Sequence, residues 1–184
     1  HYIDITKDRL YCDAEGSERR KASVWVMGQI FDALVKLLAP VLAYTTEEAW
    51  EHAGREGSIH EQDFPEVNAK YAGTEATDKV AKLLEVKAVM QTAIEEKVQA
   101  KEFKKNNEAN VLLSVPANHP SLELLKDSEF VKEFFIVSEV NVVEGEALAA
   151  TVSATGYRMC PRCRRYEPAV NDEGLCQRCA DAVS

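Results

Sequence analysis

The chain lacks several features that would define a membrane protein or a self-contained enzyme. Its 184 residues include no run of about 18 apolar residues, which a membrane-spanning helix requires. No glycine-rich phosphate loop follows a strand-like segment, and no Ser, Cys, His and Asp residues stand at a recognised catalytic spacing. We therefore predict no membrane partner and no catalytic residue, and we expect the chain to act by binding.

Positive charge is also scarce. The chain has 22 basic and 31 acidic residues, a formal charge of −9, which by itself argues against a nucleic-acid partner. The charge is uneven, however, because residues 156–179 contain five arginines and only three acidic residues. Since only a contacting face must be positive, this basic segment on an acidic body keeps a nucleic-acid partner possible.

Four of the five cysteines form two Cys-x-x-Cys pairs separated by twelve residues. Each pair can turn both sulfurs toward one point, and four thiolates complete a closed tetrahedral zinc shell. We therefore predict one structural zinc ion, with no open position for water or substrate, bound by Cys160, Cys163, Cys176 and Cys179. Residues 171–174 are predicted to form the turn between the pairs.

Two other uses of these thiols are weaker predictions. Two disulfides would require an oxidising compartment, whereas we expect no signal peptide, and 46% hydrophobic residues are enough for a core without such cross-links. Two redox-active pairs would each need a thioredoxin-like βαβ context, which the sequence does not show. Cys12 lies far from the others in an apolar setting, and we expect it to be a buried free thiol.

The first half of the chain is predicted to be mainly helical. Residues 1–13 are expected to form a short extended segment, and a helix should begin near Ser17 and end at Pro40. Its expected apolar stripe is Val24, Met27, Phe31, Leu34 and Leu38. Arg19 and Arg20 in its first turns oppose the helix dipole, so they either pair with phosphates or form a solvated surface cluster.

Two further helices are expected in this half. Thr45 and Glu48 form a capping box for a short helix, which glycines 54 and 57 should end. His60, in the loop 58–65, is expected to make packing or hydrogen-bonding contacts rather than to bind a metal. A long helix should run from Thr74 or Thr77 to about residue 105. Its last turns carry four lysines, which the helix dipole favours and which could also touch phosphates.

The apolar period changes after residue 106. We predict a buried strand at 111–115, a short helix at 121–126, one or two strands within 134–143 and a connector over 144–156. The predicted fold is a mainly α-helical bundle, followed by a small α/β unit and a zinc-ribbon-like module. The corresponding domains are 1–106, 107–150 and 151–184.

Several stretches resemble the C-terminal region of bacterial isoleucyl-tRNA synthetases. Residues 1–13 look like the segment that leads into the anticodon-binding domain of that family. Residues 39–50 (APVLAYTTEEAW) and 58–65 (SIHEQDFP) resemble elements shared by the class I synthetases for isoleucine, leucine and valine. The terminal Cys-x-x-Cys pair and the residues after it, through Val183, are similar to the isoleucine enzyme in particular. The resemblance covers nearly the whole chain.

This resemblance implies a cytoplasmic, monomeric protein whose helical domain grips the anticodon stem-loop of tRNA(Ile), with a zinc-bearing tail that closes over it. The catalytic and editing signatures of the family are missing, so ATP would bind only through a catalytic domain outside this sequence. The chain begins at His1, and we expect it to be a piece of a longer ligase. Alone, it should attach no amino acid to tRNA.

Arginines would make most of the tRNA contacts. The predicted contact residues are Arg19, Arg20, Arg162, Arg164, Arg165 and Tyr166, acting as two halves of one clamp. The family often has an aromatic residue directly after the second cysteine, where this chain has Arg164, whose planar guanidinium can also stack on a base. The alternatives are a zinc module that binds other nucleic acids and one that docks proteins. Binding that weakens steeply as salt rises would indicate a nucleic-acid ligand rather than a docked protein.

Overall fold

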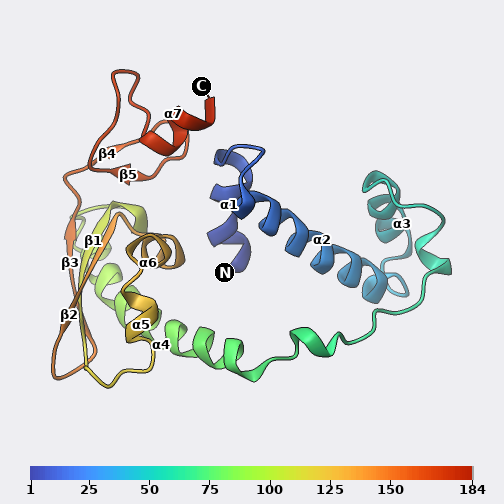
Figure 1. Cartoon of the computed structure of the whole chain (residues 1–184), viewed down its shortest axis with the longest axis horizontal. Helices are drawn as coiled ribbons and strands as arrows, with labels where there is room; N and C mark the ends of the chain where they lie inside the picture. Colours follow the sequence, from blue (N-terminus) through green and yellow to red (C-terminus); the bar gives the residue numbers. More distant parts are fainter. Residues whose placement is uncertain (184) are drawn as a thin grey trace. The chain divides into compact units, whose positions relative to one another are not determined.

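The computed structural model describes residues 1–183, apart from the side chains of Tyr71 and Thr74. The chain forms two compact units. The first, here called the sheet unit, combines residues 1–14 with the chain from Thr74 onward, and the second, the α2–α3 unit, comprises Glu15–Gly73. Figure 1 shows the course of the chain through both. These units divide the chain at other places than the predicted domain boundaries. Among the described residues, no helix is long and apolar enough to cross a membrane.

The α2–α3 unit is built from short-range packing. Its elements are α2 (Glu18–Leu38), α3 (Ala43–His52) and two 3-10 turns, η1 (Ile59–Glu61) and η2 (Ala69–Tyr71). Ser17 caps α2 as expected, because its Oγ accepts a hydrogen bond from the backbone N–H of Arg20. The small core consists of Val35, Ala39, Trp50 and Ile59. The predicted stripe on α2 is therefore only partly correct, since Val24 and Leu34 are about half exposed.

The capping box predicted at Thr45 is wrong. Helix α3 begins at Ala43, so Thr45 lies inside it, and no side chain caps its first turn. The hydroxyl of Thr46 instead donates back to the carbonyl of Leu42, at 2.9 Å. Glu47 accepts from Ser58 Oγ and from the N–H of Ile59, which ties η1 to α3. The role of Glu47 depends on this tertiary contact, so the local sequence does not predict it.

Two predictions about the following loop are confirmed. Gly54 and Gly57 both have positive φ angles, of 68° and 70°, which glycine adopts without strain, and they end the helix. His60 makes a hydrogen bond to the backbone, with its Nε2 3.2 Å from the carbonyl oxygen of Ala43. The long helix is also present, as α4 (Thr74–Gln99), although it ends six residues earlier than predicted and Lys101 follows in a left-handed conformation.

The sheet unit has a three-stranded mixed sheet at its centre. Its strands are β1 (Ala109–Val115), β2 (Glu139–Glu144) and β3 (Ala149–Ala154), in the order β2-β1-β3. Strand β1 pairs parallel with β2 and antiparallel with β3. The buried strand predicted at 111–115 is confirmed as β1. The predicted connector over 144–156 is wrong, because residues 149–154 within it pair with β1 as the third strand.

Helices cover this sheet. The buried face of α4 carries Leu83, Val86, Met90 and Ile94, which join the main core with residues of all three strands. Between β1 and β2 the chain forms α5 (Leu122–Leu125) and α6 (Ser128–Phe135). Strands were predicted from residue 134, but Phe134 and Phe135 belong to α6, whose first turn is capped by Asp127. The aromatic pair suits a buried helix face as well as a strand, so composition misled the prediction.

The N-terminal segment is also helical, not extended. Helix α1 (Tyr2–Cys12) buries Thr6 and Cys12, and Ile5 packs against the main core. Arg9 forms a two-pronged ion pair with the buried Glu133 of α6, with Nε 2.7 Å from Oε1. Alternating residues such as Tyr2 to Ile5 favour a strand locally, but these distant contacts select the helix.

The C-terminal module adds a short hairpin and a last helix. Strands β4 (Arg158–Met159) and β5 (Tyr166–Glu167) pair antiparallel, and α7 (Gln177–Val183) follows. The described chain is thus mainly helical, with a small sheet and a four-cysteine module, as the predicted fold class states in outline.

Candidate metal centre and adjoining pocket

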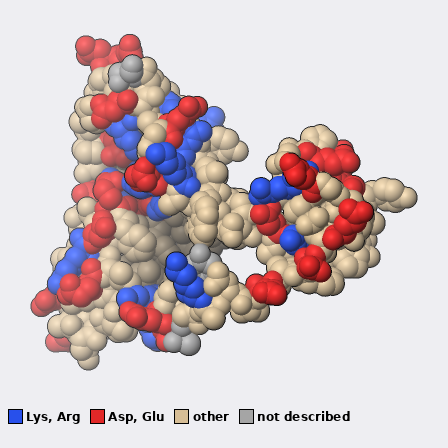
Figure 2. All heavy atoms as spheres, turned by 45° about the vertical axis from the view of Figure 1, so that its right-hand side comes forward, with Lys and Arg blue, Asp and Glu red and all other residues tan. Residues whose placement is uncertain are grey.

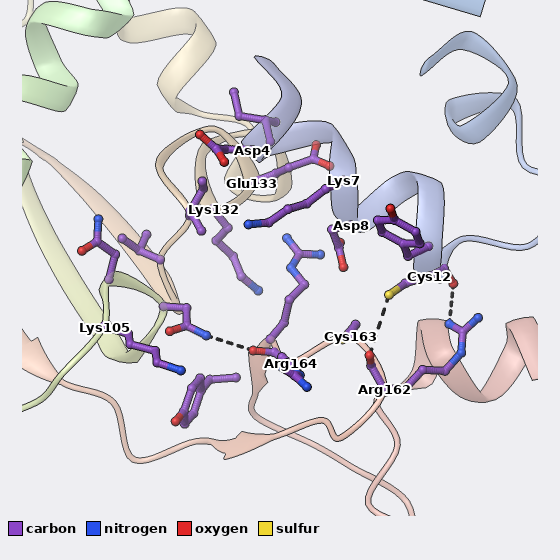
Figure 3. A pocket seen from close by; sticks show the side chains of 18 residues that line it. Asp4, Lys7, Asp8, Cys12, Lys105, Lys132, Glu133, Arg162, Cys163 and Arg164 are labelled. Atoms are coloured by element: carbon purple, nitrogen blue, oxygen red, sulfur yellow. Dashed lines mark hydrogen bonds between the residues drawn. The ribbon is translucent and has the colours of Figure 1, made fainter. Parts of the chain in front are cut away.

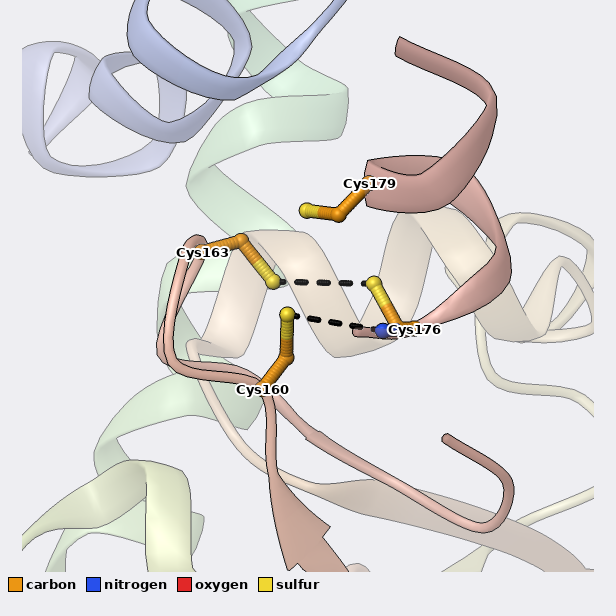
Figure 4. A group of neighbouring side chains, drawn as sticks. All are labelled: Cys160, Cys163, Cys176 and Cys179. Carbon is orange, nitrogen blue, oxygen red and sulfur yellow. Dashed lines mark hydrogen bonds between the residues drawn. The ribbon is translucent and has the colours of Figure 1, made fainter. Parts of the chain in front are cut away.

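The four paired cysteines converge on one point. Their sulfur atoms all lie within 4.8 Å of one another, and the Sγ atoms of Cys163 and Cys176 are 3.8 Å apart. Figure 4 shows the four side chains pointing toward a shared centre. In a tetrahedral zinc site with 2.3 Å bonds, neighbouring sulfurs are about 3.8 Å apart. The donor set and its spacing therefore fit a metal ion held by four thiolates.

The local sequence shapes both cysteine pairs. After the first pair, Arg164 adopts a left-handed conformation (φ 60°), and its N–H donates to the carbonyl of Cys160 at 2.8 Å. Before the second pair, the side chain of Asn171 accepts from the N–H groups of Glu173 and Leu175. Gly174, with φ of 80°, completes the tight turn predicted at 171–174. The backbone around both Cys-x-x-Cys pairs is thus shaped by hydrogen bonds between residues close in sequence.

The thiols differ in acidity when no metal is bound. Burial raises the pKa of Cys160, but hydrogen bonds from the backbone N–H groups of Cys163, Cys176 and Arg162 outweigh it and bring the pKa to about 6. Burial raises the pKa of both Cys163 and Cys176. At neutral pH one thiolate is thus readily available, while metal binding must displace protons from other thiols.

Helix α1 is attached to this module by two arginines. Arg178 makes a bidentate ion pair with Asp8, at 2.6 and 3.0 Å, and a 3.0 Å contact with Asp13. Arg162 donates to the backbone carbonyl of Cys12. Cys12 is buried, as predicted, and burial together with the charge of Asp8 raises its pKa to about 11. This cysteine is therefore a poor nucleophile.

A pocket of about 650 Å³ lies where α1, the end of α6, residues 105–107 and the cysteine module meet. Figure 3 shows Lys7 and Lys132 extending into it from α1 and α6, with Lys105 and Arg164 at the opposite side. The charged side chains that line it are Asp4, Lys7, Asp8, Lys105, Lys132, Glu133, Arg162, Arg164 and Arg165. Tyr11 and Tyr166 add aromatic surface.

The pocket is positive in effect. Two of its carboxylates already have arginine partners, since Glu133 pairs with Arg9 and Asp8 pairs with Arg178. By contrast, Lys7, Lys105 and Arg164 form no ion pair within the part of the chain that the structure describes. Three unpaired cations around one hollow attract an anionic ligand. On the face in Figure 2, basic side chains stand in small groups among acidic ones.

The predicted contact residues fall into two groups. Arg162, Arg164, Arg165 and Tyr166 all line the pocket, whereas Arg19 and Arg20 belong to the other unit, in the first turn of α2. Sequence reasoning missed Lys7, Tyr11 and Lys132 as pocket residues. It noted Lys105 only as part of a lysine-rich helix end. No local pattern marks the missed residues, because the pocket forms only when α1 packs beside residues 162–166.

Comparisons with known proteins identify the class to which this chain belongs. Residues 1–113 match the family described as the anticodon-binding domain of tRNA ligase, and the chain belongs to this family. This confirms the family resemblance seen in the sequence.

Individual relatives are similar along nearly the whole chain. It is 33% identical to the isoleucine–tRNA ligase of Persephonella marina and 34% identical to that of Zymomonas mobilis, in each case over 99% of the chain. Identity to the enzyme of Thermotoga petrophila is 32% over 97% of the chain. The chain spans about a fifth of the length of these curated relatives, 20–21%.

Proposed function

We propose that this chain is the C-terminal part of an isoleucine–tRNA ligase and that it binds the anticodon stem-loop of tRNA(Ile). The observation that carries the proposal is the alignment of 99% of the chain with isoleucine–tRNA ligases, together with its membership in the anticodon-binding family. The complete, monomeric and cytoplasmic ligase attaches isoleucine to tRNA using ATP. The chain itself contributes no catalytic residue, and ATP binds to a domain outside it.

The cysteine centre holds one structural zinc ion in this proposal. Four sulfur ligands saturate a tetrahedral ion, which leaves no position for water or substrate. Three of the four cysteines are buried, and the spacing of the sulfur atoms fits such an ion. The ion therefore supports the shape of the module and takes no part in the chemistry of the ligase.

The positive pocket is the proposed contact with the anticodon loop. Lys7, Lys105 and Arg164 supply positive charge for phosphates, and an unstacked base can lie against Tyr166 or a guanidinium plane. Arg165 lines the same pocket and reaches Glu129 only at 3.8 Å. Arg19 and Arg20 form a second contact on the α2–α3 unit. The guanidinium of Arg162 is bonded to Cys12 and Cys179, so we assign it to shaping the pocket.

The test is tRNA(Ile) affinity of the full-length ligase at several salt concentrations. Arg164→Ala should weaken binding and flatten the salt slope by about one unit, because one phosphate contact is lost. Arg164→Lys keeps the charge but lacks the planar face. It should still weaken the binding free energy for tRNA by about 1–3 kcal/mol if Arg164 stacks on a base. Arg19→Ala tests the second contact in the same way.

The control is Arg158→Ala, which removes an exposed arginine of the same module that does not line the pocket. Its affinity and salt slope should match those of the wild-type protein. Equal affinity for the wild type and all three test variants would refute the proposed contacts. A salt-independent interaction would instead point to apolar protein docking.

A further inference from the structure

Arg162 and Arg178 each connect one Cys-x-x-Cys pair with helix α1. Arg162 Nη1 donates to the backbone carbonyl of Cys12 and also lies 3.5 Å from Cys179 Sγ. Arg178, which stands between Cys176 and Cys179, pairs with Asp8 on α1 and with Asp13 directly after it. Each pair of cysteines thus carries one arginine that holds the C-terminal part of the same helix.

Both arginines stand inside the two cysteine pairs. Arg162 lies between Cys160 and Cys163, and Arg178 lies between Cys176 and Cys179. A metal that holds the four sulfurs at one point therefore also fixes the backbone that carries both arginines.

We infer that Arg162 and Arg178 are positioning residues that make the docking of α1 depend on metal occupancy of the four-cysteine centre. With the metal bound, the backbone on both sides of each arginine is fixed, and the arginines keep α1 in place through Cys12, Asp8 and Asp13. Without it, the two cysteine pairs are free to part and α1 separates more readily. The inference rests on the zinc site of the proposed function.

The docking of α1 matters because this helix forms one wall of the positive pocket. Lys7, Asp8 and Tyr11 line the pocket from α1, while Arg164 and Tyr166 line it from the cysteine module. The two walls belong to the same compact unit but are joined across more than 150 residues of sequence. Metal occupancy therefore shapes the pocket without any direct contact between the metal and a ligand in it.

The first test measures backbone hydrogen exchange of residues 6–13 in this chain, with zinc bound and after chelation. In the wild type, chelation should speed exchange about tenfold or more, the factor expected when charge-assisted contacts are lost from a local opening equilibrium. In the double variant Arg162→Gln/Arg178→Gln, exchange should already be fast with zinc bound and should change little on chelation. The amides of β1 (109–115) serve as the folding control, because they lie in the main core.

The second test uses the thiol of Cys12 as a reporter in zinc-loaded protein. The bound metal protects the four ligand cysteines, whereas Cys12 is shielded only by packing, with 6% of its surface exposed. Alkylation of Cys12 should be about tenfold faster in Arg178→Gln than in the wild type and intermediate in Arg178→Lys, which keeps a charge but loses the bidentate geometry. Arg158→Gln, in the same module, should react like the wild type.

Zinc content is measured for every sample, so that loss of docking is distinguished from loss of metal. The inference is overturned if exchange in α1 does not respond to chelation in the wild type. It is also overturned if the double variant remains as metal-responsive as the wild type, or if the protein binds no metal. None of these readouts uses tRNA, so a failure of tRNA binding in the proposed function would be seen separately.

Discussion

The two compact units are stabilised by contacts of very different range. In the α2–α3 unit, the buried core lies within residues 35–59, and its bidentate ion pair, Arg55 with Asp32, joins residues 23 positions apart. In the sheet unit, α1 contacts residues that follow it by 124 to 170 positions, through Arg9–Glu133 and Arg178–Asp8. Local sequence patterns therefore describe the first unit better than the second.

Loss of the metal should give the largest difference in stability between the two units. Replacing Cys160 with Ser removes one of four ligands, and apparent binding energies of structural zinc are about 10–16 kcal/mol, so the cysteine module should lose its fold. The α2–α3 unit should keep its hydrogen-exchange protection, because it contains no ligand cysteine. Metal analysis should find about one zinc per wild-type chain. Cys12→Ser is the matched control and should retain the metal; a fully loaded Cys160→Ser protein would contradict the assignment.

The ion pair between α1 and α6 should show the next largest effect. Arg9→Met removes the guanidinium from Glu133, a carboxylate that is only 8% exposed, and breaking such a buried pair costs about 3–5 kcal/mol. Urea unfolding of the sheet unit measures this loss. The double variant Arg9→Met/Glu133→Leu should recover most of it, because the buried charge is gone. A single variant as stable as the wild type would show that α1 docks without this pair.

Shortening a core side chain of the α2–α3 unit should lower the stability of that unit alone. Trp50 is 6% exposed, and its Nε1 donates to the carbonyl of Glu56 at 3.3 Å. Trp50→Ala should destabilise the unit by about 3 kcal/mol through the cavity that it leaves. Trp50→Phe keeps most of the apolar contact and should cost less. Hydrogen exchange resolved by residue would reveal whether the loss spreads into the sheet unit, which we do not expect.

The surface ion pair of the α2–α3 unit should matter least. Asp32 and Arg55 have side chains that are 31% and 42% exposed, and exposed pairs typically contribute about 0.2–1 kcal/mol. Asp32→Asn should therefore cost less than about 1 kcal/mol, and the difference should vanish at high salt. Urea unfolding at low and high salt measures both effects. A loss as large as that of Arg9→Met would contradict the contrast between short-range and long-range pairs.

More of the errors of sequence-based prediction lie in the sheet unit, although the capping box predicted at Thr45 in the α2–α3 unit was also wrong. The capped start of α2, the glycine breaks at 54 and 57, and strand β1 were predicted, because each depends on residues close in sequence. The predictions for α1, α6 and β3 were wrong, because each element is selected by packing against distant residues. Phe134 is an example, since its aromatic side chain suits a buried strand as well as the helix face that it occupies.

The sequence by itself determined which four cysteines cluster and the family of this protein. Cysteine spacing is a local property, and the structure brings Cys160, Cys163, Cys176 and Cys179 together as that spacing predicts. Only the tertiary structure decided which groups the arginines beside them contact. Arg162 looked like an RNA contact in the sequence, but its guanidinium is bonded inward, while Arg164 remains at the pocket. Such roles depend on which distant carboxylates and carbonyls lie within hydrogen-bonding reach, and chain folding alone sets those distances.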